Sequence, residues 1–110
     1  MSFTPLTRFN YHETLEQTPG PALVVITSRG CGACRAVKRA LVAMREPIAL
    51  FEVDAGQSPG VAAALEVFHL PAMFLYVDGA FHAPIHAEAR AERLREAIHA
   101  AAAGPAQEEP

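Results

Sequence analysis

The sequence predicts an α/β fold, in which strands and helices alternate along the chain. Two apolar runs, at residues 22–26 and 48–53, are too short for helices of ordinary length and are typical of strands. Segments with helical periodicity follow these runs, and an Asp78-Gly79 pair between two further apolar segments predicts a β-hairpin turn. The 110 residues, 51% of them hydrophobic, can close one core but not two.

The first half of the chain predicts a short helix, a buried strand and a longer helix. Residues 11–17 lie between two proline-containing stretches, and their apolar spacing predicts one or two helical turns. Residues 22–26 are continuously apolar, which is typical of a central strand covered on both faces. From Cys34 until Pro47, apolar residues recur at helical spacing between basic residues and predict an amphipathic helix. The apolar positions of this helix are Val37, Leu41 and Met44.

The second half predicts a strand, a helix, a β-hairpin and a final helix. The first of these helices is marked by Ser58 as N-cap and Pro59 at the first helical position. The predicted ranges are 48–53, 58–66, 72–77 with 80–85 for the hairpin, and 87–103. Residues 106–110 are expected to be a disordered acidic tail, so the predicted domain covers residues 1–105.

The chain has two cysteines, and both lie in the segment Cys31-Gly32-Ala33-Cys34 between the central strand and the amphipathic helix. This placement holds two sulfur atoms within bonding distance at a helix N-terminus, where unpaired backbone amides stabilise a thiolate. Arg29 and Arg35 add positive charge nearby. The pattern favours thiol–disulfide exchange, with the thiol pKa of Cys31 lowered from about 8.5 toward about 7.

Two other interpretations of the cysteine pair stay open at this point. The pair could be reduced and structural, or it could be half of a zinc or iron–sulfur site, which needs further ligands. Among the histidines, His69 alone is expected to approach the cysteines, so a metal site would need a fourth ligand or a second chain. The sequence therefore predicts redox exchange, with no metal and no cofactor other than the cysteine pair.

Composition and charge exclude several classes of partner. The net charge is −3 and the cationic residues are dispersed, which argues against binding to nucleic acid. Residues 1–5 do not begin a charged region followed by an apolar run, and no stretch approaches the roughly 20 apolar residues of a membrane span. We therefore expect a cytoplasmic monomer without membrane contact.

Several landmarks, in this order, resemble those of the thioredoxin family. They are Cys31-Gly32-Ala33-Cys34, Val53-Asp54, Leu70-Pro71-Ala72 and Asp78-Gly79. The resemblance covers nearly the whole chain. It implies a thioredoxin-like α/β fold with a central mixed β-sheet flanked by helices on both faces.

The resemblance also implies roles for individual residues. Cys31 would be the exposed attacking thiolate and Cys34 the buried resolving thiol. Pro71 would form a cis peptide bond beside the sulfur atoms, and Leu70 would offer backbone hydrogen bonds to an extended substrate. Arg29 would either steer acidic partners or be solvated. The expected substrate-binding residues are Leu70, Pro71, Gly30 and Arg29.

The activity implied by the resemblance is reduction of protein disulfides. Electrons would come from a reductase, by family analogy a flavin enzyme that uses NADPH. A glutathione-linked role is disfavoured because the glutaredoxin landmarks are absent, with Gly32-Ala33 and His69-Leu70-Pro71 in their places. One alternative is a partner-binding or redox-sensor module without turnover, and a further alternative is a metal or iron–sulfur site shared between two subunits.

The chain departs from the family pattern near the cysteines. Gly30 stands in place of a tryptophan, Val25 in place of a buried aspartate, and Leu50 in place of the lysine that pairs with that aspartate. We therefore expect Cys34 deprotonation to depend on water or to be slow. Ala33 replaces a proline between the cysteines, which predicts a slightly more oxidising pair than in a typical thioredoxin. Arg39 replaces a proline that kinks the helix, which predicts a straighter helix.

Overall fold

The secondary structure follows the predicted alternation of strands and helices. The structure is a computed structural model and describes residues 2–110. Its elements in chain order are β1 (Thr4–Leu6), α1 (Tyr11–Glu16), β2 (Pro21–Thr27), α2 (Gly32–Met44), β3 (Ala49–Asp54), α3 (Pro59–Ala64), β4 (Ala72–Val77), β5 (Ala80–Ile85) and α4 (Ala91–Ala103). None of the helices within residues 2–110 is long and apolar enough to cross a membrane.

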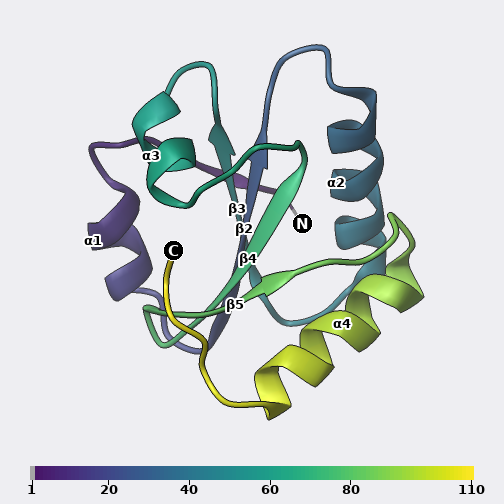
Figure 1. The fold of residues 1–110 in the computed structure, drawn as a ribbon. Helices are drawn as coiled ribbons and strands as arrows, with labels where there is room; N and C mark the ends of the chain where they lie inside the picture. The colour runs from purple at the N-terminus through teal and green to yellow at the C-terminus, as the bar shows by residue number, and fades with distance from the viewer. Residues whose placement is uncertain (1) are drawn as a thin grey trace.

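The strands form one mixed sheet in the order β1-β3-β2-β4-β5. Strands β1, β3 and β2 are parallel, and β4 and β5 are antiparallel to their neighbours. The apolar strand β2 occupies the centre, as the sequence predicts. Because β2 and β3 run parallel, their carboxyl ends meet at one edge of the sheet, and the loop from β2 to α2 starts there (Figure 1).

Helices cover both faces of the sheet. Figure 1 shows α1 and α3 on one side and α2 and α4 on the other. Side chains alternate along β2 accordingly: Val24 and Ile26 join the core beside α1 and α3, whereas Leu23 and Val25 join the core beneath α2 and α4. The predicted mixed sheet with helices on both faces is confirmed.

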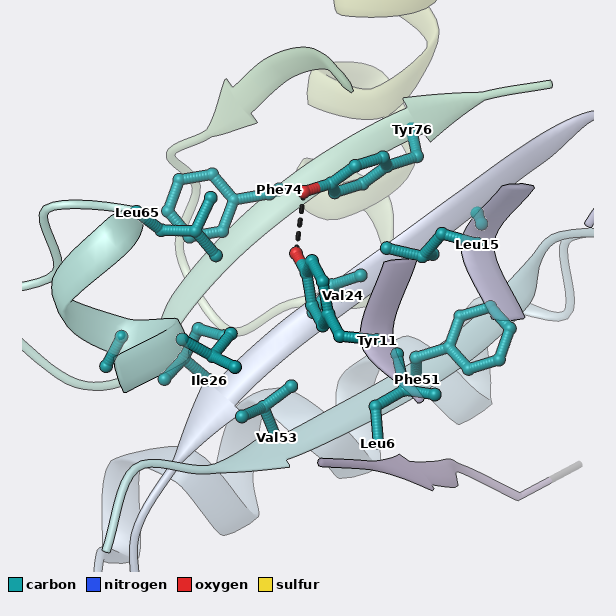
Figure 2. Packing of buried hydrophobic residues seen from close by; sticks show 13 residues of the cluster. Leu6, Tyr11, Leu15, Val24, Ile26, Phe51, Val53, Leu65, Phe74 and Tyr76 are labelled. Carbon is teal, nitrogen blue, oxygen red and sulfur yellow. Dashed lines mark hydrogen bonds between the residues drawn. The ribbon is translucent and has the colours of Figure 1, made fainter. Parts of the chain in front are cut away.

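A tyrosine pair lies within the first of these cores. The hydroxyl oxygens of Tyr11 on α1 and Tyr76 on β4 are 2.6 Å apart in a buried hydrogen bond (Figure 2). Burial raises the pKa of Tyr76 to about 12 and raises that of Tyr11 as well. The bond satisfies both hydroxyl groups where water is excluded, and it joins α1 to the sheet.

Several element boundaries differ from the predicted ones. The sequence analysis missed β1, which has three residues and includes a proline; an edge position tolerates that residue. Helix α3 ends before residue 66 because Glu66 has a φ of +55°, in the left-handed region that ends helices. Helix α4 starts at Ala91 rather than at residue 87, because Arg90 has an extended backbone.

The C-terminal segment follows α4 without regular secondary structure. The backbone N–H of Gln107 donates a hydrogen bond to the carbonyl oxygen of His82 on β5, over 2.7 Å. The chain then ends on the face of the sheet that carries α1 and α3 (Figure 1). Disorder of residues 106–110 in solution stays a prediction.

Candidate redox site at the start of helix α2

Cys31 and Cys34 form a disulfide at the N-terminus of α2. Cys31 is the N-cap residue, with an extended backbone, and its sulfur accepts the backbone N–H of Cys34 at 3.0 Å. The two Cα atoms are 5.2 Å apart, a separation that a disulfide bridges readily. The predicted placement of the cysteine pair at a helix N-terminus is therefore confirmed.

The two cysteines differ in solvent exposure. Cys34 is 2% exposed, whereas Cys31 is half-buried. The first turn of α2 contains no acidic residue that would oppose the positive end of the helix dipole. A thiolate on Cys31 would therefore be both reachable from solvent and stabilised by the helix N-terminus, while Cys34 is shielded.

Gly30 shapes the loop that leads into the site. Its φ is +73°, a left-handed conformation that residues with a side chain rarely adopt. Gly30 and its neighbour Arg29 are both exposed. The loop conformation thus explains why a glycine stands directly before Cys31.

Pro71 lies beside the start of α2. The Leu70–Pro71 peptide bond is cis, as the resemblance implies. A shallow groove contains Pro71 together with residues from α2, β4, β5 and the segment after β5. Its lining residues are Ala33, Val37, Pro71, Met73, Ile85, His86, Ala87 and Ala89. The fold therefore brings the segment between the two cysteines next to the cis-proline.

The four predicted substrate-binding residues are distributed unevenly around this groove. Pro71 lines it, and Gly30 and Arg29 lie in the exposed loop before Cys31. The side chain of Leu70 is partly buried and packs against the core beneath α1 and α3. The substrate-binding roles of these residues stay predictions.

Residues 2–110 contain no group of three or more histidine, cysteine or acidic side chains that could hold a metal ion. His69 is exposed. The cysteines instead bond to each other, which is the arrangement expected for redox exchange.

Comparison with protein families identifies the fold. A family model described as thioredoxin matches residues 2–100. The chain belongs to the thioredoxin family. Membership in this family, together with the Cys31–Cys34 disulfide, supports thiol–disulfide redox chemistry in general.

Solved structures share the thioredoxin fold. The human ERp44 zinc-bound form matches with a TM-score of 0.76 and 16% identity, over 90% of this chain and 31% of that chain. A chain from a structure described as the basis of thiol resolving in yeast mitochondrial 1-Cys peroxiredoxin, via glutathione and thioredoxin systems, matches with a TM-score of 0.75 and 21% identity. That match covers 90% of this chain and 95% of that chain. A search of curated proteins found no match.

The structure contains a polar cluster that the sequence analysis missed. Val25 and Leu50, which replace the polar pair of other thioredoxins, are buried and apolar. Glu52, two residues after Leu50, binds Lys38 on α2 with 2.6 Å between Oε1 and Nζ. The hydroxyl of Thr27 donates a hydrogen bond to Glu52 Oε2 at 2.7 Å.

A sequence signal for this cluster was present. Glu52 is the single charged residue within the run 48–53, and Lys38 follows Cys34 by one helical turn. The apolar pattern of this run predicts a strand but by itself indicates no partner for the carboxylate within it.

Proposed function

We propose that this protein is a thiol–disulfide oxidoreductase that reduces protein disulfides through a Cys31–Cys34 dithiol–disulfide cycle. The observation that carries the proposal is the arrangement of the pair. Half-buried Cys31 caps a helix N-terminus and is bonded to buried Cys34, three residues later. One sulfur is thus placed for attack on a partner and the other for intramolecular resolution.

The proposed cycle has two exchange steps. The Cys31 thiolate attacks one sulfur of a substrate disulfide, forms a mixed disulfide and releases one substrate sulfur as a thiolate, which takes up a proton. Cys34 then loses its proton and attacks Cys31 Sγ. The Cys31–Cys34 bond forms, the bond to the substrate breaks, and the second substrate sulfur leaves as a thiolate, which takes up a proton in place of the one lost by Cys34. The substrate gains two electrons and the cysteine pair loses two.

Regeneration needs an external electron donor. We propose a reductase, by family analogy an NADPH-dependent thioredoxin reductase, and a reducing cytoplasm in which the net direction is reduction of the partner. The shallow groove that Ala33 and Pro71 line is the proposed place for an extended protein segment as substrate. We propose that the protein works as a monomer.

A second candidate function is partner binding or redox sensing without turnover. The observations that favour it are Gly30 and Val25, at the positions where other family members carry a tryptophan and a buried acid. In this case the disulfide state would control binding of one partner, and reduction of generic disulfides would be negligible.

Reduction of insulin disulfides with dithiothreitol as electron donor separates the two candidates. Wild-type protein is expected to accelerate reduction, Cys31→Ser to abolish the acceleration, and Cys34→Ser to accumulate a mixed disulfide that mass spectrometry detects. Glu88→Gln changes an exposed residue of an ion pair and serves as control. Absence of acceleration by wild-type protein whose disulfide has been fully reduced would exclude the oxidoreductase proposal.

A further inference from the structure

The polar cluster of Thr27, Lys38 and Glu52 lies on the face of the sheet that α2 covers. Glu52 is the register partner of Val25, and Val25 belongs to the core beneath α2 and α4. Register partners in a sheet project toward the same face. The carboxylate of Glu52 therefore points toward α2, where the Lys38 ammonium group meets it.

The cluster is connected along the chain to both cysteines of the disulfide. Lys38 lies four residues after Cys34, so the two side chains are neighbours on one face of α2. Thr27 ends β2, and the next three residues lead to Cys31. Its hydroxyl is hydrogen-bonded to Glu52. The carboxylate is thus held from two elements, each of which also positions one of the cysteines.

A buried thiol needs a base in order to form a thiolate, because burial disfavours the charged form. Cys34 is 2% exposed. The side chains of Glu52 and Lys38 are 26% and 31% exposed, so water reaches the carboxylate. The other acid of β3, Asp54, accepts hydrogen bonds from the backbone N–H groups of Gly56 and Gln57 in the following turn.

We propose that Glu52 is the base of the second exchange step, and that its carboxylate accepts the Cys34 proton through water. This inference rests on the proposed oxidoreductase function. The Cys34 S–H bond breaks, its proton passes to Glu52, and the Cys34 thiolate attacks Cys31 Sγ. The partner thiolate that leaves then takes a proton from the Glu52 carboxylic acid. Oxidation of the cysteine pair by two electrons is matched by reduction of the partner disulfide.

Groups from α2, β2 and the N-terminal segment surround the Glu52 carboxylate. From α2, Lys38 contacts the carboxylate and Arg39 shares the shallow pocket beside it. From β2 the neutral Thr27 donates a hydrogen bond, and the N-terminal segment contributes uncharged Ser2 and Phe3 to the same pocket. The charged neighbours of the carboxylate at this pocket, Lys38 and Arg39, are both cationic.

Stopped-flow reaction of the reduced protein with 5,5′-dithiobis(2-nitrobenzoate) follows the two steps separately. Attack by Cys31 releases the first coloured thiolate and leaves a mixed disulfide; attack by Cys34 releases the second. Glu52→Gln is compared with Glu46→Gln, a matched control, because Glu46 also forms an ion pair and has a side-chain exposure of 22%. Both phases are recorded from pH 6 to 8.

We expect Glu52→Gln to leave the first phase unchanged and to slow the second phase at least about tenfold at neutral pH, since a positioned general base contributes on the order of 10²- to 10⁴-fold. The second phase of wild-type protein should vary little with pH. In Glu52→Gln it should rise about tenfold per pH unit, because thiolate formation then depends on hydroxide. Glu52→Asp should restore part of the rate, which a purely structural role does not predict.

Equal rates of the second phase in Glu52→Gln and Glu46→Gln would overturn the inference and leave the proposed function intact. Absence of either phase in wild-type protein would instead overturn the proposed function. If Glu52→Gln does not fold, Lys38→Met provides the test, because loss of the ion pair frees the carboxylate from the position in which α2 holds it and should slow the second phase. An unchanged second-phase rate in that variant would also overturn the inference.

Discussion

Val25 on β2 and Glu52 on β3 are register partners in a parallel strand pair. Val25 is fully buried, whereas the Glu52 carboxylate binds Lys38 and accepts a hydrogen bond from Thr27. A carboxylate therefore remains on the face of the sheet beneath α2, although the position at which other thioredoxins carry one is apolar. Because the two positions are register partners on the same face, a carboxylate at either position should lie beneath α2.

Transfer of the carboxylate to position 25 should restore the second exchange step. In the double variant Val25→Asp/Glu52→Gln, the acid moves to the register partner on the same face of the sheet. We expect a second-phase rate above that of Glu52→Gln, together with a stability loss of about 2–5 kcal/mol because the new carboxylate is buried. The rate is measured by stopped flow and the stability by urea unfolding. A folded double variant as slow as Glu52→Gln would contradict this prediction.

Gly30 should be required for the loop before Cys31, because its φ is +73°. Gly30→Ala is expected to lower the free energy of unfolding by about 1–2 kcal/mol, which is the cost of a left-handed residue with a side chain. Gly60 lies in α3 with open space around its Cα, so Gly60→Ala is a matched control and should stabilise the protein by about 0.5–1 kcal/mol. Equal effects of the two substitutions in urea unfolding would show that the loop does not need glycine.

Ala33→Pro should make the cysteine pair more reducing. Residue 33 is exposed and lies in the first turn of α2, where a missing N–H breaks no helical hydrogen bond. Proline restricts the reduced segment more than the disulfide-bonded one, so it favours the disulfide. A difference of about 1.4 kcal/mol corresponds to about 30 mV for two electrons. Equilibration with a glutathione buffer measures the shift, and a higher potential in the variant would refute the argument.

Stability should fall at alkaline pH because of the tyrosine pair. Burial raises the pKa of Tyr76 to about 12, whereas an unfolded tyrosine has a pKa of about 10. The native state therefore retains a proton that the unfolded chain releases. The resulting contribution to the free energy of unfolding is fully present below about pH 10 and is lost as the pH rises toward about 12. The hydrogen bond to Tyr11 belongs to the same buried pair.

Urea unfolding of the disulfide-bonded protein at about pH 8 and pH 11 checks the tyrosine prediction. Wild-type protein should lose about 2–3 kcal/mol more between these values than Tyr11→Phe/Tyr76→Phe, since the pH unit from about 10 to 11 contributes about 1.4 kcal/mol for each of the two tyrosines. The double variant removes both hydroxyls, so neither remains buried without a partner. Identical pH dependence of the two proteins would contradict the prediction.

The central elements of the fold were predictable from local patterns. Strand β2 is continuously apolar, α2 has regular apolar spacing, and the β4–β5 turn contains Asp78 and Gly79 with positive φ values of 50° and 83°. Each of these signals arises within a few residues of sequence. The antiparallel pairing of β4 and β5 follows from the same turn, and the central position of β2 from its apolar run. The mixed sheet with helices on both faces follows from the family resemblance rather than from periodicity.

Other features depend on tertiary contacts. Strand β1 has three residues and is defined by its pairing with β3, so no local pattern marks it. The side chain of Leu70 packs against the core beneath α1 and α3, a contact that no local pattern marks. The Glu52–Lys38 contact joins residues 14 positions apart in sequence, and it becomes visible only when α2 is placed on β3.

The equilibrium reduction potential of the Cys31–Cys34 pair tests the proposed redox function most directly. The protein is equilibrated in glutathione buffers, alkylated and analysed by mass spectrometry. We predict one reversible two-electron transition between about −270 and −180 mV, the range of exchange-active thioredoxin-fold pairs. A pair that stays oxidised below about −300 mV would behave as a structural disulfide, and this result would contradict the proposed function.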